Sequence, residues 1–511
     1  MISENDSVRL LSQFVEEMDL TDLLSTYTRI RKNHLSPRRL LKIMLYAYMN
    51  GEFSTRSIEQ RCKRDINFMY LLEGAPAPDH ATLARFRSLH FAPAAQRLMA
   101  EPSRYLYDLG EISGEALYID GTKIEACANK YTFVWKKATT KNLEKLLNKL
   151  AAFVAECEEN YGFKIVYHDQ VKIKHLKKLR KKLYALKKAE GIIFVHGSGK
   201  RKSLLQKSIE TLEAHLEKFK EYTQKLYICG QRNSYSKSDH DATFMRMKED
   251  AMGNGQLKAG YNLQHGVDSE YITWLSVGPQ PTDTTTLIPF IKEIEEQLPF
   301  KYAKIVADAG YESEENYQYI EANGQIAFIK PANYEKAKSR KYKNDIGRAE
   351  NMAYDALTDS YTCHNGKKLT VKSVKKEKSK TGYEREKTIY SCSECNGCGY
   401  KKECIKGSST KPIEERQKSL HISKQFQRQR EASQERTRGE EGKELRMNRS
   451  IQAEGSFGEM KQARGFRRYL SRGKEKVRGE SVQMAIAHNI NKLHNKIQKE
   501  KLGKHRYALK G

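Results

Sequence analysis

Three carboxylates in this sequence have surroundings that suit the binding of metal ions. Asp120 ends the apolar segment 116–120 and Asp308 ends the segment 305–308, and a glycine follows each within two residues. Each segment predicts a buried strand that presents its aspartate at the C-terminal edge. Glu454 lies in a segment that favours a helix. An aspartate at a strand end is usually a turn residue, but together the three predict a cage for hard divalent cations, which also engage phosphate oxygens.

Two other acidic residues compete for the third position. Glu459 lies five residues after Glu454 and would face elsewhere on a helix, and Glu480 lies near the start of the last predicted helix. We favour Glu454. The cluster 239–241 contains two more aspartates, but acids grouped in a loop more often form turns.

The composition is strongly basic. The chain has 92 Lys and Arg against 64 Asp and Glu, a formal net charge of +28 and a pI of about 9.5. Such an excess is typical of proteins that bind a polyanion, although a basic surface can also serve solubility. The sequence has no run of about 18 apolar residues and no signal-peptide pattern. We therefore expect a cytoplasmic protein without a membrane partner, built of two or more domains.

Five of the nine cysteines cluster near one another in the sequence. Cys395, Cys398 and Cys404 follow a knuckle-like spacing, and Cys363 upstream supplies a fourth thiolate for tetrahedral zinc in a reducing compartment. Cys392 could replace one of them. We expect a structural zinc ion, because no glutamate base is evident beside the cysteines. An iron–sulfur cluster or a metal-free segment are the alternatives.

The first 110 residues predict helices. Ser36 and Pro37 form an N-cap and first-turn pair, and Asp79 precedes a basic amphipathic segment that carries Arg85 and Arg87. Two such helices could read DNA as a helix-turn-helix unit does, with both arginines on the DNA. An ordinary helical bundle with solvated arginines is an equal alternative.

Farther along the chain, residues 140–226 carry leucines at helical spacing among Lys, Arg and Glu, which predicts a helical hairpin with a narrow apolar seam. Its lysine-rich stretch 172–188 could follow a phosphate backbone or be a solvated face. The segments 257–268 and 271–277 predict antiparallel strands. Ser313 is expected to cap a helix behind the second aspartate.

In these residues the chain resembles the DDE transposases of bacterial insertion sequences, most closely the branch with an inserted helical hairpin and a cysteine-bearing insert. The likeness rests on 118–126, 306–311 and 449–461, extends to 78–86, 239–243 and 255–258, and spans about residue 30 to 495. It implies an α/β fold in which a ribonuclease-H-like mixed sheet is flanked by helices. The first Asp should lie on the first strand, the second Asp after the fourth, and the Glu on a later helix.

Six segments are expected on this resemblance. They are an N-terminal helical DNA-binding domain (1–110), the first part of the catalytic core (111–139), the inserted helical hairpin (140–228), the rest of the core (229–334), a cysteine-rich zinc-binding insert (335–411), and the Glu-bearing helix of the core with a C-terminal helix (412–511).

The resemblance implies that Asp120, Asp308 and Glu454 bind two Mg²⁺ or Mn²⁺ ions. Two ions about 3.5–4 Å apart can activate a water or a 3′-hydroxyl and stabilise the leaving oxygen. Asp120, central in the sheet, is expected to bridge both ions, with one further carboxylate on each. Lys461 follows Glu454 by two α-helical turns, so both should project from one face, where the lysine would contact DNA phosphate. A plain exposed lysine is the alternative.

Arg449 is expected to contact DNA beside these carboxylates. It lies one position farther from Glu454 than the arginine that is usual in the family, so Arg446 and Arg464 compete for its role.

The activity implied is transposition of DNA. The enzyme would bind the terminal inverted repeats of its element, cleave them to free 3′-hydroxyls, and join these to target DNA, acting in the nucleoid as a homodimer or larger assembly. A non-catalytic DNA-binding relative and a nuclease without strand transfer are the alternative readings. Metal-dependent nicking and strand joining would separate the three.

Overall fold

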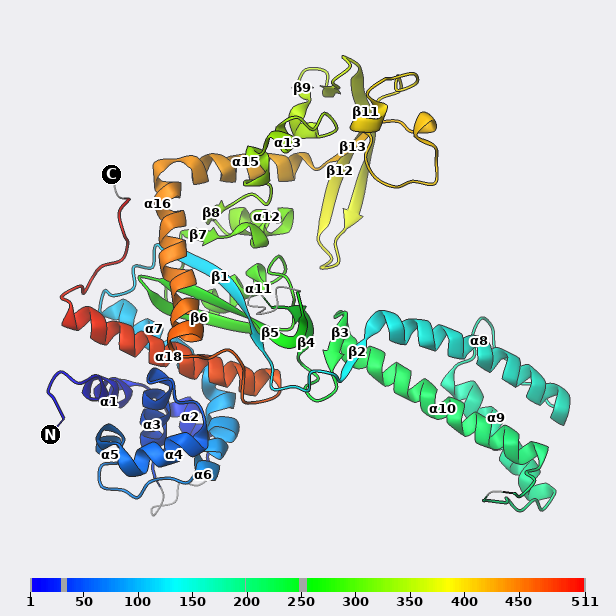
Figure 1. Ribbon diagram of the computed structural model, residues 1–511, viewed down its shortest axis with the longest axis horizontal. Coiled ribbons are helices and arrows are strands. Elements are labelled where there is room, and N and C mark those ends of the chain that lie inside the picture. The colour runs from blue at the N-terminus through cyan, green and yellow to red at the C-terminus, as the bar shows by residue number, and fades with distance from the viewer. Residues whose placement is uncertain (1, 29–34, 198, 248–254, 510–511) are drawn as a thin grey trace. The chain divides into compact units, whose positions relative to one another are not determined.

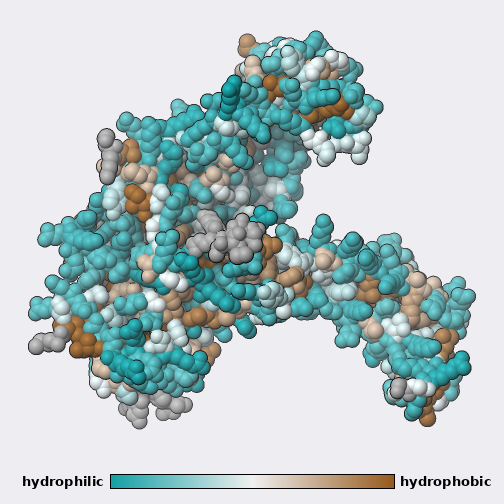
Figure 2. Space-filling model, viewed as in Figure 1, coloured by the Kyte–Doolittle hydropathy of each residue, from teal (hydrophilic) through white to brown (hydrophobic). Residues whose placement is uncertain are grey.

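The computed structural model describes residues 2–28, 35–197, 199–247 and 255–509 (Figure 1). The chain divides into two compact units, one formed by Met1–Ile124 and Asn262–Gly511 and the other by Glu125–Tyr261. Hydrophilic residues cover most of the face in view in Figure 2. Among the described residues, no helix is both long and apolar enough to cross a membrane.

The N-terminal part of the first unit is helical, as predicted. Ser36 accepts a hydrogen bond from the Arg39 amide, and Asp79 accepts one from the Thr82 amide, so both predicted N-caps are confirmed. The helices are α1 (Ser7–Glu17), α2 (Thr21–Ser25), α3 (Pro37–Met49), α4 (Thr55–Arg64), α5 (Ile66–Leu72), α6 (His80–Arg85), the π-helical η1 (Phe86–Phe91) and α7 (Ala92–Asp108).

A mixed sheet lies at the centre of the first unit. Five of its six strands are β1 (Ala116–Glu125), β5 (Leu257–Asp268), β6 (Tyr271–Gly278), β7 (Lys304–Ala307) and β8 (Ile326–Ile329). In the order β6-β5-β1-β7-β8, β7 is parallel to β1 and to β8, and β6 is antiparallel to β5. Successive residues of β1 and β7 are buried on both faces, which explains the continuous apolar runs that end in the two aspartates.

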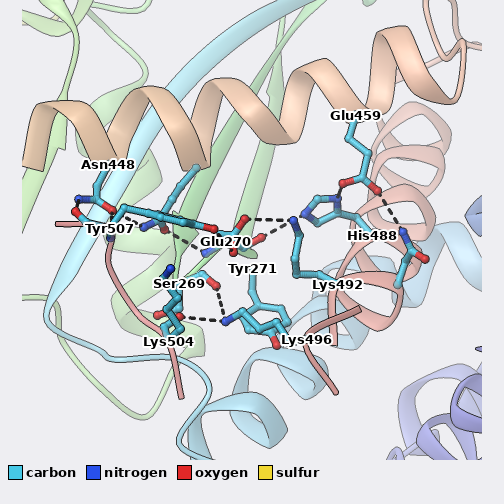
Figure 3. Close-up of polar contacts among 12 residues, drawn as sticks. Ser269, Glu270, Tyr271, Asn448, Glu459, His488, Lys492, Lys496, Lys504 and Tyr507 are labelled. Atoms are coloured by element: carbon cyan, nitrogen blue, oxygen red, sulfur yellow. Dashed lines mark hydrogen bonds and ion pairs between the residues drawn. The ribbon is translucent and has the colours of Figure 1, made fainter. Parts of the chain in front are cut away.

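The turn between β5 and β6 confirms the predicted antiparallel pair. Ser269 and Glu270 have φ angles of 56° and 72°, which non-glycine residues rarely adopt. Lys492 of α18 (Lys474–Gln498) and Tyr507 of the C-terminal tail donate to the Glu270 carboxylate at 3.1 and 3.0 Å (Figure 3). These contacts hold the turn in its unusual conformation.

Helices pack against the sheet. α7 and α18 contact β6, whereas α15 (Lys424–Arg438) and α16 (Glu440–Arg449) contact β8. Ser313 caps the helix behind Asp308, α12 (Glu314–Ala322), by accepting from the Asn316 amide, as predicted. The other elements of this region are α11 (Leu287–Gln297), the 3₁₀ turn η2 (Ala309–Tyr311), the π-helical η6 (Ser450–Glu454), α17 (Gly455–Gly458) and the π-helical η7 (Glu459–Ala463).

The second unit contains three long helices instead of the predicted hairpin of two. They are α8 (Lys136–Tyr161), α9 (Ile173–Ala189) and α10 (Leu204–Cys229), and α10 packs on both others. Gly162, with a φ of 67°, ends α8 where the leucine pattern suggested continuity. The leucines of all three share one core, as the apolar seam predicted. In the same unit β2 (Phe133–Trp135) pairs with β3 (Ser234–Ser236), and β4 (Thr243–Arg246) pairs with the start of β5.

A second sheet, antiparallel and five-stranded, lies in the first unit around the clustered cysteines. Its order is β13-β12-β11-β10-β9. The strands are β9 (Ala353–Asp355), β10 (Ser360–Thr362), β11 (Lys368–Lys378), β12 (Glu384–Ser391) and β13 (Ser419–Ile422), with short helical turns η3 (Lys336–Lys338), α13 (Arg340–Lys343), η4 (Ala349–Asn351), α14 (Lys401–Cys404) and η5 (Ile413–Glu415) nearby. Its buried core is small and includes Tyr361, Leu369 and Tyr390.

Candidate active site

Asp120 lies within β1 and Asp308 directly follows the neighbouring parallel strand β7, at the same level of the sheet. β1 and β7 pair in a register that places Ile119 beside Ala307, and the two aspartates are the next residues. Asp120 is 6% exposed. Asp308 begins η2, where its Oδ1 accepts from the Gly310 amide at 2.8 Å. The two strands therefore bring two carboxylates to neighbouring positions, but the prediction that the first strand ends at Asp120 is wrong, because β1 continues to Glu125.

Arg449 links the third carboxylate to the first. Its Nη2 lies 2.7 Å from Glu454 Oε1, and its Nη1 lies 3.8 Å from Asp120 Oδ2. The Ser450 hydroxyl donates to Glu454 Oε2 at 3.0 Å. The arginine side chain is 15% exposed and that of Glu454 is 50% exposed. The Arg449 guanidinium is therefore paired with Glu454 of the helical segment and lies close to Asp120 of the sheet.

The carboxylates are arranged around this arginine and do not form a closed ligand set. Within the described ranges, no three Asp, Glu, His or Cys side chains are close enough to share one metal ion. Arg449 supplies the positive charge between Asp120 and Glu454. The donors are nevertheless carboxylate oxygens, the ligand type that hard divalent cations take.

A fourth carboxylate, Asp283, belongs to this region and was not predicted. Its Oδ1 accepts from the side-chain amides of Asn262 and Gln264 at 2.7 and 2.9 Å. A methyl group added to Gly121 would lie 2.8 Å from Asp283 Oδ1, and one added to Gly310 would lie 3.4 Å from Oδ2. Asp283 therefore packs against Gly121 and Gly310, the glycines that follow Asp120 and Asp308. Its only sequence signal is its place in a threonine-rich turn before α11.

The hydroxyl of Tyr311 lies among these acids. Its ring is fully buried, and its hydroxyl donates to Gln264 Oε1. Burial, together with the negative charges of Asp283, Asp120 and Asp308, raises the pKa of Tyr311 well above its ordinary value. The tyrosine therefore stays protonated and serves as a fixed donor beneath the carboxylates.

The two competing acids have internal partners. Glu459 lies 2.5 Å from Arg464 Nη2 and 2.9 Å from His488 Nδ1, a contact visible in Figure 3. Burial alone would raise the pKa of Glu459, but these two partners hold it well below its usual range. Glu480 is fully buried and accepts from the Leu470 amide at 2.9 Å. Both acids are therefore bound to partners in the interior. Of the three candidates, Glu454 is the one that shares a partner, Arg449, with Asp120.

The segment that carries Glu454 is wound more widely than predicted. Ser450–Glu454 and Glu459–Ala463 are π-helical and flank a single α-helical turn. The 3.6-residue period used to place Glu454 and Lys461 on one face does not hold across these turns. Glu454 is half exposed, whereas Lys461 is 7% exposed. Burial of Lys461 argues against the predicted contact with DNA phosphate.

The competing arginines lie elsewhere. Arg446 stacks over the Tyr334 ring, 5.5 Å from its centroid, and Arg464 is committed to Glu459. Among these candidates Arg449 is the arginine that approaches the carboxylates.

The two arginines predicted to contact DNA from the N-terminal helices differ. Arg85 is exposed. Arg87 is 9% exposed and donates from Nη1 to the Phe53 carbonyl at 3.1 Å. The expected DNA contact of Arg87 is therefore corrected, because η1 turns its guanidinium into the helical interior.

All five clustered cysteines line one small cavity. They are free thiols around a space of about 20 Å³, lined by Cys363, Cys392, Cys395, Cys398 and Cys404 together with Lys367, Glu394, Lys401, Ile405 and Lys418. That volume is close to the space occupied by one water molecule. Burial raises the pKa of the Cys392 thiol to about 11. As they stand, no three of the thiols are near enough to one another to hold an ion.

Two family models match the chain. Residues 362–494 match a family described as a transposase DDE domain, and residues 1–89 match a transposase domain described as DUF772. Glu454 lies in the first match, whereas Asp120 and Asp308 lie in neither. No curated protein and no solved structure matches the chain. Residues 362–494 are therefore similar to the DDE domain of transposases, enzymes that cleave DNA and transfer strands with divalent metal ions, and residues 1–89 are similar to a second transposase domain.

Proposed function

We propose that this transposase binds the terminal inverted repeats of an insertion sequence, cleaves the ends by hydrolysis with two metal ions, and transfers the 3′-hydroxyl ends to target DNA. The observation that carries the proposal is the pairing of β1 with β7, which brings Asp120 and Asp308 together. The net charge of +28 supports an extended polyanion as substrate.

We infer that the central sheet is ribonuclease-H-like. In chain order the six strands are β1, β4, β5, β6, β7 and β8, so Asp120 lies on the first strand, as the resemblance implied, whereas Asp308 follows the fifth and not the fourth. The parallel arrangement of β1, β7 and β8 and the antiparallel pair β5 and β6 support this assignment.

Asp120, Asp308 and Glu454 are the residues we assign to two Mg²⁺ or Mn²⁺ ions. Their carboxylate oxygens fit such cations. When bound, the ions would lower the pKa of the attacking water or hydroxyl and stabilise the leaving oxygen. Asp120 is the candidate to contact both ions, because it lies beside Asp308 on the sheet and shares Arg449 with Glu454.

The protein itself would orient the carboxylates and the DNA. Arg449 fixes Glu454, and its Nη1 is buried without a hydrogen-bond acceptor among the described residues. The Arg449 side chain is 15% exposed, and a guanidinium has further N–H groups with which it can bond a phosphate oxygen. Asp283 would act as a positioning residue for Asp120 and Asp308, since it packs against Gly121 and Gly310, which follow them.

Each chemical step is an in-line displacement at phosphorus. In cleavage, water attacks the phosphorus and the bond to the 3′-oxygen breaks, which leaves a 3′-hydroxyl and a 5′-phosphate. In strand transfer, that 3′-hydroxyl attacks a target phosphate and displaces its 3′-oxygen. Because both ends must be held at once, we propose a homodimer or larger assembly, with Arg449 and the exposed Arg85 as DNA contacts. Buried Arg87 and Lys461 are not part of this proposal.

We also propose one structural zinc ion in the cysteine-lined cavity. Cys363, Cys395, Cys398 and Cys404 would close the tetrahedron, and Cys392 could replace one ligand. The convergence of five free thiols on one small space supports this, as does the modest core of the surrounding sheet.

Isosteric variants of the three carboxylates test the function. Asp120→Asn, Asp308→Asn and Glu454→Gln should each abolish nicking and strand joining of end DNA in magnesium, while binding to that DNA persists. Each change removes an anionic ligand with almost no change in volume. Glu440→Gln, on the exposed first turn of α16, is the matched control and should keep full activity.

The outcome also separates the alternatives. A wild-type protein that nicks but never joins strands would be a nuclease, and one that binds without nicking would be a non-catalytic relative. A carboxylate variant with near wild-type nicking would remove that residue from the metal site.

A further inference from the structure

The helix α9 is basic along its whole length. Its 17 residues, IKHLKKLRKKLYALKKA, include seven lysines and one arginine and neither Asp nor Glu. The neighbouring helix α10 has four lysines and four glutamates in LLQKSIETLEAHLEKFKEYTQKLYIC. The charge of α9 is therefore a property of that helix and not of the second unit as a whole.

One face of α9 is buried and the opposite face is free. Leu176, Leu179 and Leu183 are fully buried and belong to the core that α9 shares with α10. The spacing of these leucines turns the remaining positions outward. The exposed lysines on that outer side are Lys174, Lys177, Lys178, Lys181 and Lys188.

The other basic side chains of α9 already have partners. Arg180 pairs with Glu213 at 2.5 Å, Lys182 lies over the Phe163 ring, and Lys187 lies over the Phe194 ring. In the part of the chain that the structure describes, the five outer lysines form no ion pair. Their positive charge is left uncompensated within the protein.

The outer lysines are spaced by three, one, three and seven residues, so they lie along one side of the helix and form a stripe. From Lys174 to Lys188 the stripe is about 21 Å long at the rise of an α-helix. A strand of B-DNA carries one phosphate per about 3.4 Å of helix axis, so the stripe can face about six phosphates of one strand. Lys177 and Lys181, with Arg180 and Tyr184, also line a shallow hollow on this surface. Lysine ammonium groups contact phosphates as point charges and do not distinguish bases.

We propose that the outer face of α9 is a contact surface for the phosphate backbone of double-stranded DNA, independent of base sequence. The proposal rests on the proposed function only in taking DNA as the partner. It assigns to the inserted helices a share of the binding energy for any duplex, whether transposon end or target.

A fourfold substitution in the full chain tests this surface. The variant Lys174→Gln, Lys177→Gln, Lys178→Gln and Lys181→Gln removes four charges and leaves the leucine core intact. The slope of log Kd against log salt should fall by about 3 to 4, since each lost phosphate contact removes about 0.9. Affinity at low salt should fall at least about 100-fold, and equally for end DNA and for an unrelated duplex.

The matched control makes the same change of charge on α10. It replaces Lys207, Lys218, Lys220 and Lys225 with Gln. On this helix the four lysines are balanced by four glutamates. The control should keep nearly the wild-type slope. An equal loss in both variants would overturn the proposal in favour of net charge alone, and a loss confined to end DNA would overturn backbone contact in favour of base recognition. A wild-type chain that binds no duplex would overturn this surface, whereas a wild-type chain that binds DNA through these lysines but never nicks it would overturn only the proposed function.

Discussion

The Nη1 of Arg449 lies 3.8 Å from Asp120 Oδ2, although the two residues belong to the two separate chain segments that form the first unit. The same guanidinium lies 2.7 Å from Glu454. Neither carboxylate has to touch the other, because the arginine offsets the charge of both. Arg449 and the Ser450 hydroxyl, which donates to Glu454 Oε2 at 3.0 Å, therefore hold the Glu454 carboxylate together, and Arg449 alone links it to Asp120.

Removing that side chain should impair catalysis more than DNA binding. Arg449→Ala should lower the rate of end cleavage by about 100-fold or more, as expected for loss of one oriented charge at a reacting phosphate. Arg449→Lys should recover only part of the activity, because one ammonium cannot bond two carboxylates in the geometry of a guanidinium. Single-turnover nicking in magnesium, with binding to end DNA measured in parallel, gives both quantities.

Arg446→Ala is the control for this experiment. Arg446 lies on the same helix but stacks on Tyr334, so its loss should leave the cleavage rate within a few-fold of wild type. Near wild-type cleavage by Arg449→Ala would mean that the contact with Glu454 plays no part in the reaction.

The close approach at Gly121 gives a second prediction. A methyl group there would lie 2.4 Å from Gln264 Nε2 and 2.8 Å from Asp283 Oδ1, so Gly121→Ala must displace both side chains. We expect a loss of about 1–3 kcal/mol in the free energy of unfolding and a marked loss of cleavage. Gly458→Ala is the control, since nothing lies within 4 Å of its added methyl, and it should be neutral or stabilising by up to about 1 kcal/mol. Denaturant unfolding of both variants measures the difference.

Asp283 itself can be tested by two substitutions. Asp283→Asn keeps an oxygen that can accept from Asn262 and Gln264, whereas Asp283→Ala removes it. If Asp283 positions the loops, the asparagine variant should keep most of the cleavage rate and the alanine variant should lose at least about 10-fold. Equal and complete loss in both variants would instead identify the negative charge as essential, as for a metal ligand.

The features that the sequence predicted correctly are governed by local interactions. The helix starts at Ser36, Asp79 and Ser313 each depend on a side chain that accepts from the amide three residues later. The two strands that carry Asp120 and Asp308 were visible because a buried parallel strand needs a continuous apolar run, although β1 extends beyond Asp120 to Glu125. Both signals survive in any fold that buries the same segments.

The features that were missed depend on contacts between distant segments. Asp283 has ordinary turn neighbours, and only the folded chain brings it to Gly121 and Gly310. The π-helical turns around Glu454 leave no periodic signal, so an α-helical period was assumed for Lys461. The cysteine-bearing sheet was not predicted as strands because lysines dominate its exposed strand β11.

His265 should make stability depend on pH. Its ring is buried, with Nδ1 3.0 Å from Ser456 Oγ and a stacked contact of 4.2 Å to Phe457. Burial lowers the pKa of His265 to about 3. Below the unfolded value of about 6.5, the unfolded chain binds a proton that the folded chain excludes, so stability falls as pH falls from 6.5 toward 3. At pH 5 this residue should cost about 2 kcal/mol relative to pH 7.5.

Tryptophan fluorescence can isolate this effect. The chain has two tryptophans, and in a Trp135→Phe background the buried Trp274 reports on the central sheet alone. His265→Gln keeps a hydrogen-bonding side chain but cannot titrate, so its loss of stability between pH 7.5 and 5 should be smaller by about 2 kcal/mol. The exposed His168→Gln should behave as wild type. Identical pH profiles for both variants would exclude His265 as the source.

Zinc in the cysteine-lined cavity is the prediction with the widest consequences for the first unit. Protein purified without added metal should contain about one equivalent of zinc, because four thiolates around so small a space can close a tetrahedron. Cys395→Ser and Cys398→Ser should lose the metal, whereas Cys127→Ser, outside the cluster, should retain it. Chelation should expose the amides of 353–422 to hydrogen exchange and weaken DNA binding, since the sheet there has little apolar core. Less than about a tenth of an equivalent by elemental analysis, with amide protection unchanged by chelator, would mean that this sheet folds without metal.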